Sequence, residues 1–464
     1  MNKLFLSQIA AFAGGTLAAG DPGATIERVS TDSRTVKRSE LFVALRGENF
    51  DGHKFVEDVA KVGAVGAMVQ ENWKGDVPKK FALIRVADTL AGYQSLAGTY
   101  RKSLNLKVVC ITGSNGKTST KDFTAAVLGR RFHVAKTDGN FNNHVGLPRT
   151  MLEAGSEHEV AVWELGMNHP GEIAGLAHIA APDAGIITNI GVAHIEFLGS
   201  REAIAREKGQ LAAAIGPNGW VVLNAEDPFS DQIEKMTSAR VIRAGTESGS
   251  ICAGEIRQTS EGSEFTILEG AHRCRAQLPV PGLHMVQNAL LAVAAGRAFG
   301  LSLEECAEGL AAAPLTKARL QIREIGGVQF LDDSYNANPD SMKAALRTLI
   351  ELDAPGKRIA VLGEMGELGA ESEKGHREVG EEAATLGVDH LIAIGKLGAL
   401  IAERARACGL QESVAVATTS EAAGKLGELT APGDLVLIKG SRLARTERVL
   451  EEFAAHQPAE GVSR

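Results

Sequence analysis

The chain has 464 residues, which is more than one hydrophobic core normally supports, so we expect two or three domains. Its 49 basic and 57 acidic side chains give a net charge of −8, which would repel a phosphodiester backbone and disfavours general nucleic-acid binding. The five cysteines are scattered without a CxxC pair, which suggests neither a disulfide framework nor a thiolate zinc site and fits the reducing cytoplasm. The apolar stretch at residues 1–6 is short, and no apolar run reaches about 18 residues, so we expect neither a secretory signal nor a membrane span.

The first part of the chain has the pattern of a small α/β domain. Residues 1–104 carry short apolar runs typical of strands, a helical pattern near 55–62 and another at 91–101. Beyond them, apolar strands alternate with amphipathic helices, which predicts a mostly parallel sheet covered by helices. A polar segment at 246–277 predicts an antiparallel excursion, and a helix is expected at 284–299. The parallel strands of this middle part are expected near 108–112, 160–165, 185–190 and 220–224.

A glycine-rich loop joins the strand at 108–112 to a helical pattern at 121–128. Its sequence is Thr112-Gly113-Ser114-Asn115-Gly116-Lys117-Thr118-Ser119. Glycines let backbone N–H groups point inward, the next helix presents its positive end, Lys117 supplies charge, and the Thr118 hydroxyl can hold Mg²⁺. The loop is shorter than the common GxxxxGK[ST]. The sequence predicts a nucleotide phosphate site, although a glycine-rich turn with an incidental lysine would look similar.

Two polar residues follow strands beside this loop. Glu164 ends the strand at 160–165, and His194 follows the strand at 185–190. A carboxylate is an oxygen ligand that Mg²⁺ prefers, and both residues would lie at the sheet edge that carries Thr118. The sequence therefore predicts a metal site beside the phosphates. The alternatives are a solvated or helix-capping Glu164 and a loop histidine bonded to backbone.

Two further features of the middle part are ambiguous. Lys208 lies beside Glu207 on a predicted helix, and taken alone it reads as a surface lysine. The loop at 137–148 holds three asparagines, Asn140, Asn142 and Asn143, which form either a dense set of hydrogen-bonding groups for a ligand or simple turn chemistry.

After a boundary at 314–316 a second series of strands and helices begins. It predicts a doubly wound, Rossmann-like sheet whose ligands lie at the carboxyl ends of the strands. Polar residues at 331–339 follow one strand there, in a position typical of a ligand site, and a helix is expected at 341–352. Only the tail after Pro458 has the pattern of disorder. The strands of this part are expected near 328–331, 358–362, 390–394, 414–417 and 435–438.

The shortened loop, Glu164, His194, Lys208 and the polar segment at 333–339 together resemble the ATP-dependent Mur ligase family, over nearly the whole chain. Within the family the likeness is greatest to ligases that join D-alanyl-D-alanine to UDP-N-acetylmuramoyl-tripeptide. The segments that carry this finer likeness are 164–173, 332–338 and 362–369, and segments at 30–34, 42–48 and 51–53 resemble the UDP-sugar-binding domain of the family. The resemblance implies α/β architecture with a small N-terminal substrate-binding domain at 1–104, a central P-loop ATPase domain with a parallel sheet at 105–315, and a C-terminal Rossmann-like ligase domain at 316–464.

The resemblance also implies roles for single residues. Lys208 would be carbamylated and would help to hold a second Mg²⁺. Arg319 would reach the γ-phosphate; it follows Ala318, where the family usually has glycine. The residues implied in ATP binding are Gly113, Ser114, Asn115, Gly116, Lys117, Thr118, Ser119, Asn288, Arg319, Asp333 and Tyr335. The residues implied around two Mg²⁺ ions are Thr118, Glu164, His194 and Lys208, and those implied in catalysis are Lys117, Lys208, His194 and Arg319. The residues implied in substrate binding are Ser33, Arg34, Asn140, Asn143 and Asn336.

The expected reaction is carboxylate activation through an acyl phosphate, followed by attack of the dipeptide amine, which yields the UDP-muramoyl-pentapeptide precursor of peptidoglycan. We expect a cytoplasmic monomer whose partners are small molecules. A sister enzyme, either another Mur ligase or a folylpolyglutamate synthetase-like ligase, is the first alternative; in the latter the loop lies near the N-terminus, whereas here residues 1–111 precede it. A P-loop switch or motor is the second, but it leaves Lys208, His194 and the segment at 333–338 unexplained.

Overall fold

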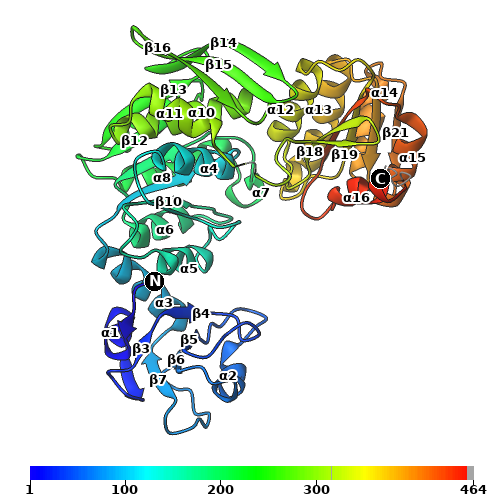
Figure 1. The fold of residues 1–464 in the computed structure, drawn as a ribbon. Helices are drawn as coiled ribbons and strands as arrows, with labels where there is room; N and C mark the ends of the chain where they lie inside the picture. The colour runs from blue at the N-terminus through cyan, green and yellow to red at the C-terminus, as the bar shows by residue number, and fades with distance from the viewer. Residues whose placement is uncertain (315, 457–464) are drawn as a thin grey trace, which may run out of the picture.

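The computed structural model of the chain describes residues 1–314 and 316–456. Three α/β units follow one another along the chain, each with its own sheet (Figure 1). The α/β class and the three-domain architecture expected from the sequence are confirmed. Residue 315, at the expected boundary, and the tail after Pro458 lie outside the described residues. In the part that is described, no helix has the length and apolar character needed to cross a bilayer.

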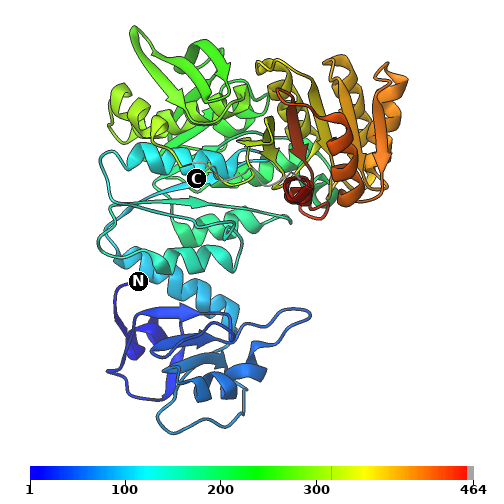
Figure 2. The same ribbon diagram turned by 45° about the vertical axis from the view of Figure 1, so that its right-hand side comes forward.

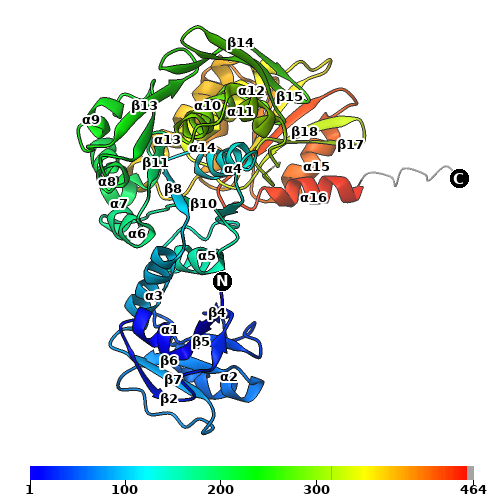
Figure 3. The same ribbon diagram turned by 60° about the vertical axis from the view of Figure 1, so that its left-hand side comes forward.

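The N-terminal unit contains a five-stranded sheet that is parallel except at one edge, where β2 runs antiparallel to β7. In spatial order its strands are β2 (Thr16–Ala19), β7 (Ala82–Val86), β6 (Gly66–Gln70), β5 (Glu40–Val43) and β4 (Arg28–Ser30). The other elements of this unit are β1 (Leu4–Phe5), α1 (Leu6–Phe12), β3 (Thr25–Ile26), η1 (Gly52–Phe55), α2 (Val56–Val62) and α3 (Thr89–Ser103). Figure 3 shows α3 beside α5 (Gly146–Glu153), where this unit meets the next.

Residues 107–278 build the nine-stranded sheet of the middle unit. The order is β16 (His272–Leu278), β15 (Gly262–Glu269), β14 (Ile251–Thr259), β13 (Arg240–Gly245), β12 (Trp220–Asn224), β11 (Ala184–Ile187), β8 (Lys107–Thr112), β10 (Val160–Glu164) and β9 (Val134–Lys136). The strands from β9 to β14 pair in parallel, and β14 to β16 form the expected antiparallel excursion. Because β8 lies between β10 and β11, the loops that follow these three strands meet at one edge of the sheet.

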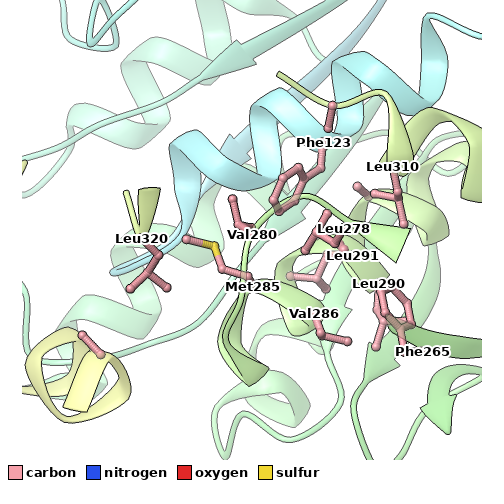
Figure 4. Close-up of a cluster of buried hydrophobic side chains, with 14 of the residues drawn as sticks. Phe123, Phe265, Leu278, Val280, Met285, Val286, Leu290, Leu291, Leu310 and Leu320 are labelled. Carbon is pink, nitrogen blue, oxygen red and sulfur yellow. The ribbon is translucent and has the colours of Figure 1, made fainter. Parts of the chain in front are cut away.

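The helices of the middle unit pack on both faces of this sheet, as the continuous apolar strands require. They are α4 (Lys117–Leu128), α5, α6 (Glu172–Ala180), α7 (Ile195–Leu198), α8 (Arg201–Ala213), α9 (Ser230–Glu234), α10 (Leu283–Ala298) and α11 (Leu303–Ala311). Figure 4 shows the core where Phe123 of α4 and Leu291 of α10 meet. Leu320, at the start of the third unit, lies near Met285 in the same cluster and is fully buried. This packing fixes the position of the neighbouring Arg319.

Among residues 316–456, six strands form the third sheet, which is parallel apart from the edge strand β17. Their order is β17 (Gln321–Ile325), β18 (Val328–Asp333), β22 (Leu435–Lys439), β19 (Arg358–Leu362), β20 (His390–Ile394) and β21 (Ser413–Val416). The helices are α12 (Pro339–Glu351), η2 (Gly369–Glu371), α13 (Ser372–Thr385), α14 (Gly398–Ala407), α15 (Thr419–Leu429) and α16 (Glu447–His456). Figures 1 and 2 show this unit beside the middle unit and away from the first.

Ala318, where the resemblance to the Mur ligase family implies a glycine, has an unusual backbone conformation. Ala318 has φ +56°, the left-handed conformation that glycine adopts without strain. We expect Ala318→Gly to raise the free energy of unfolding by about 0.5–1 kcal/mol, because the strain relieved exceeds the added entropy of the unfolded chain. Ala312, exposed with φ −90° at the end of α11, offers a control whose change to glycine should lower stability. Urea unfolding of both variants checks this; a loss of stability in Ala318→Gly would contradict it.

Candidate active site

A cleft of about 950 Å³ lies between the middle and third units, at the carboxyl ends of β8, β10, β18 and β22. It brings together most of the residues selected from the sequence. Those that line it are Ser114, Asn115, Gly116, Lys117, Thr118, Ser119, Asn140, Asn143, Glu164, His194, Asn288, Arg319, Asp333, Tyr335 and Asn336. Four others, Ser33, Arg34, Gly113 and Lys208, are not part of its lining.

The glycine-rich loop has the close-packed geometry expected of a phosphate cradle. Gly113 and Gly116 have φ +151° and +77°, and a Cβ atom on Gly116 would lie 2.4 Å from Oδ1 of Asn288. The Lys117 ammonium donates to the carbonyl oxygens of Gly113 (2.9 Å) and Ser114 (3.4 Å), so the side chain folds back across the loop. Burial lowers the pKa of Lys117, and the nearby positive charge of Arg319 also lowers it. An anion in this loop would meet backbone N–H groups, a helix start and a lysine.

The loop is also held from outside. Asn115 receives a hydrogen bond on its backbone carbonyl from Thr188 Oγ1 (2.5 Å) and donates its N–H to Asn189 Oδ1 (2.9 Å). From the third unit, Asn338 Nδ2 donates to Asn115 Oδ1 (2.7 Å), and Asp340 accepts from the backbone N–H of Val192 (3.1 Å). These contacts tie the third unit to the rim of the phosphate loop.

Oxygen ligands gather at the start of α4. Thr118 Oγ1 donates to Glu164 Oε2 (2.9 Å) and accepts from Arg319 Nη2 (3.2 Å), while Asn142 Nδ2 donates to Glu164 Oε1 (2.7 Å). Glu164 is only 2% exposed. In residues 1–314 and 316–456, no group of three or more His, Cys, Asp and Glu side chains could hold a metal by itself. The Thr118–Glu164 pair fits Mg²⁺, which takes one or two carboxylates together with substrate phosphates.

His194 faces the third unit. Its Nδ1 lies 2.8 Å from Oε2 of Glu367, at ion-pair distance but without hydrogen-bond geometry. This contact with His194 lowers the pKa of the Glu367 carboxyl, an effect that burial opposes. The expectation that Thr118, Glu164 and His194 follow adjacent strands is confirmed by the sheet order, but a direct contact is described only between the first two.

The reading of Lys208 as a surface lysine is wrong, because the residue is 1% exposed inside α8. Among the described residues nothing forms a hydrogen bond or ion pair with its ammonium group, and the Glu207 carboxylate instead accepts from the backbone N–H groups of Gly171 and Ile173. Burial lowers the pKa of Lys208 well below its usual value, and the charge of Lys117 lowers it further. Burial and the Lys117 charge therefore both disfavour the charged ammonium form of Lys208.

The third unit contributes a compact polar cluster. The Arg319 guanidinium lies 4.4 Å above the Tyr335 ring, and Lys439 donates to Asp333 (2.5 Å) and to the carbonyl of Asn336 (3.0 Å). The register explains this contact, since Asp333 and Lys439 are paired across β18 and β22.

Residues expected to bind the muramoyl substrate lie in two places. Asn143 Oδ1 accepts from the N–H of Gly146 (2.8 Å) at the start of α5, so it supplies turn chemistry as well as lining the cleft. Arg34 pairs with Asp32 (2.8 Å) on the N-terminal unit, and this contact lowers the pKa of Asp32 to about 2. The strand β4, which directly precedes this loop, contacts α5, so the loop lies on the side that faces the middle unit.

Sequence reasoning gave no individual role to four residues that line the cleft, namely Asn142, Asn338, Glu367 and Lys439. Three of them lay inside segments already singled out, the asparagine loop at 137–148 and the segments at 331–339 and 362–369, and Lys439 directly follows the strand expected at 435–438. A position at or just after the end of a predicted strand therefore indicated that a residue lies near the cleft. The sequence did not indicate which residue each side chain contacts.

His284, at the wall of the cleft, gives a test of pH dependence. Burial lowers its pKa from 6.5 to about 4, and Lys439 adds to this while Asp333 opposes it. The unfolded chain binds this proton first as the pH falls, so stability should be lost between about pH 6.5 and about pH 4. We expect His284→Gln to remove about 1–2 kcal/mol of that loss. Urea unfolding across this range measures it, with the exposed His178→Gln as control; an unchanged pH profile for His284→Gln would refute the assignment.

Comparison with known proteins decides the family. Three family models match the chain: the Mur ligase family catalytic domain at residues 25–82, the Mur ligase middle domain at 111–296, and the Mur ligase glutamate ligase domain at 318–442. A curated UDP-N-acetylmuramoyl-tripeptide–D-alanyl-D-alanine ligase of Bacillus subtilis is 39% identical over 98% of this chain and 99% of its own. This chain belongs to the Mur ligase family. The Escherichia coli protein of the same name is 37% identical over 97% of this chain and 98% of its own.

Solved structures of Mur ligases agree. A crystal structure of MurF from Acinetobacter baumannii matches with a TM-score of 0.91 at 33% identity, covering 98% of this chain and 99% of the other. MurF from Thermotoga maritima in complex with ADP matches with a TM-score of 0.83 at 28% identity, covering 92% of this chain and 97% of the other. A folylpolyglutamate synthase of Mycobacterium tuberculosis, at 18% identity and a TM-score of 0.63, shares the fold.

Proposed function

We propose that this Mur ligase joins D-alanyl-D-alanine to UDP-N-acetylmuramoyl-tripeptide at the expense of ATP, giving the UDP-muramoyl-pentapeptide precursor of peptidoglycan. Full-length relatives that carry this activity in their names support the substrates, and the ADP complex of a related structure supports the nucleotide. The observation that carries the proposal is the cleft in which the phosphate loop, the Thr118–Glu164 pair and Arg319 of the third unit meet. We also propose that the protein is a monomer in the cytoplasm.

The reaction uses no protein nucleophile. The terminal carboxylate of the tripeptide attacks the γ-phosphate of ATP, releasing ADP and forming an acyl phosphate. The amine of the dipeptide then adds to the acyl carbon, and phosphate leaves. Two anions meet in the first step, so Lys117 and Arg319 stabilise the charge that builds up on the transferring phosphoryl group. Hydrogen bonds from Asn338 and Asp340 already join the two units beside this site. Closure of the third unit over the bound substrates would exclude water, which would otherwise hydrolyse the acyl phosphate.

Within the proposal, the residues that would hold two Mg²⁺ ions are Thr118, Glu164, His194 and a carbamylated Lys208. Bound magnesium would supply positive charge to the phosphate oxygens. Lys208 is buried, has no partner among the described residues, and has a pKa that burial lowers. These features support carbamylation, because an uncharged amine reacts with CO₂ and the product is an anion that can pair with nearby cations. In the same proposal, the nucleoside is contacted by Asn288, Asp333 and Tyr335. The muramoyl tripeptide is contacted by Ser33, Arg34, Asn140 and Asn143, and the dipeptide is contacted by Asn336.

One incubation tests this function. The full chain is supplied with ATP, Mg²⁺, UDP-N-acetylmuramoyl-tripeptide and D-alanyl-D-alanine, and the pentapeptide is sought by mass spectrometry. Product formation that needs all components supports the proposal, as does phosphate release that needs both peptide substrates. A P-loop switch would release phosphate without either, and a folylpolyglutamate synthetase-like ligase would extend a folate substrate instead.

A further inference from the structure

One contact in the cleft that the proposed function leaves unexplained joins Glu367 and His194, which belong to different units. Glu367 lies between β19 and η2 of the third unit, whereas His194 directly precedes α7 of the middle unit. We propose that Glu367 is a positioning residue that orients His194 only when the third unit is docked, so that docking and metal binding are coupled. This inference rests on the proposed function for the role of His194 as a metal ligand.

The loop that carries Glu367 is fixed within the third unit. The Glu364 carboxylate accepts from the N–H of Leu397 (2.6 Å), and the Glu364 carbonyl accepts from the N–H of Ser441 (2.9 Å). His376 Nε2 accepts from the N–H of Met365 (3.0 Å), while Met365 itself is buried. The loop therefore moves with the third unit as one body, and the docking of that unit decides whether Glu367 reaches His194.

Backbone conformation on both sides supports a specific contact. His194 and Glu367 have φ +63° and +60°, a region that residues other than glycine rarely adopt and that persists where surrounding contacts hold it. Next to this pair, Gly369 lies close to Glu196. A Cβ atom added to Gly369 would lie 3.0 Å from Cγ of Glu196. A glycine at this point lets η2 approach α7, which brings the two strained residues together.

The chemistry of the contact suits a metal ligand. A histidine that ligates a metal through one ring nitrogen commonly directs the other to a carboxylate, which fixes the ring and its tautomer. Here Nδ1 faces Glu367, so Nε2 is the nitrogen left for a metal ion. The middle unit supplies the histidine and the third unit supplies the carboxylate, so neither unit alone contains the complete arrangement.

The test measures metal binding directly. Full-length protein with a non-hydrolysable ATP analogue is titrated with Mn²⁺ and followed by electron paramagnetic resonance; the relevant site is the one lost in His194→Ala. We expect Glu367→Gln, which keeps the shape but removes the charge, to weaken this site by about tenfold. Glu371→Gln is the matched control, because Glu371 lies nearby in η2 but pairs with exposed Lys374 (3.0 Å), and it should bind Mn²⁺ like the wild type.

Two further readouts distinguish coupling from a structural role. In the His194→Ala background Glu367→Gln should cause no additional loss at any Mn²⁺ site, and small-angle scattering with analogue and Mn²⁺ should show a less compact Glu367→Gln variant. Wild-type Mn²⁺ affinity in Glu367→Gln would overturn the inference, and so would an unchanged scattering curve or an additive loss in the double variant. A wild-type protein that binds Mn²⁺ but forms no pentapeptide would refute the proposed function and leave this comparison valid.

Discussion

Replacing Lys208 with alanine should slow ligation by about 10²–10³-fold, and added formate or acetate should restore part of the rate. Lys208 is enclosed in the middle unit, has no hydrogen-bonding partner among the described residues and lies within electrostatic range of Lys117. If it acts as a carbamate, the alanine variant loses an anion and leaves a space that a small carboxylate can fill. Steady-state assays of pentapeptide formation, with and without the added acids, measure this effect.

Lys208→Met provides the matched control. Methionine fills the same space without a charge, so we expect an equal loss of rate but no rescue by formate. The methionine variant should also be at least as stable as the wild type without CO₂, because a buried amine without a partner is costly. Full ligation activity in either variant would show that the carbamate is unnecessary.

The parts of the fold that the sequence predicted are those that local patterns determine. The apolar run at 108–112 followed by glycines and Lys117 specifies a buried strand, a phosphate loop and a helix start, and the structure has all three as β8, the loop and α4. The antiparallel excursion was likewise visible as a change in pattern, and appears as β14, β15 and β16. Alternation of apolar and polar residues is a local property, so it can be detected within a short stretch of sequence.

The parts that could not be predicted depend on contacts between distant residues. Lys208 looks like a surface lysine because its own helix places charged Glu207 beside it, and only the packing of α8 in the middle unit encloses it. Glu367 was inside a segment noted from the sequence, but its partner His194 is 173 positions away, and their contact depends on docking of the third unit. Burial and docking are properties of the assembled chain, and a single sequence carries them only indirectly.

Replacing Lys117 with methionine should reduce ligation by about 10³-fold and leave the fold intact. The Lys117 ammonium donates to two carbonyl oxygens of its own loop, beside the place where the loop would hold phosphates, and burial lowers its pKa when no anion is present. A bound phosphate would favour the charged form again. Product formation and binding of a fluorescent ATP analogue measure the loss, and thermal unfolding checks that the variant is folded at the assay temperature.

The next lysine on the same helix gives the opposite expectation, which makes the prediction specific. Lys121 is also buried, but its ammonium donates to the carbonyl oxygen of Thr137 (2.8 Å) and lies 3.5 Å from the Asp122 carboxylate. Asp122 also forms an ion pair with Lys136 (2.6 Å). Lys121→Met should lower the free energy of unfolding by about 1–3 kcal/mol, because it leaves a buried carbonyl without its donor, while the folded variant retains its rate of ligation. If Lys117→Met instead kept its rate and lost stability, the lysine would be a structural residue and the loop would need another source of positive charge for the phosphates.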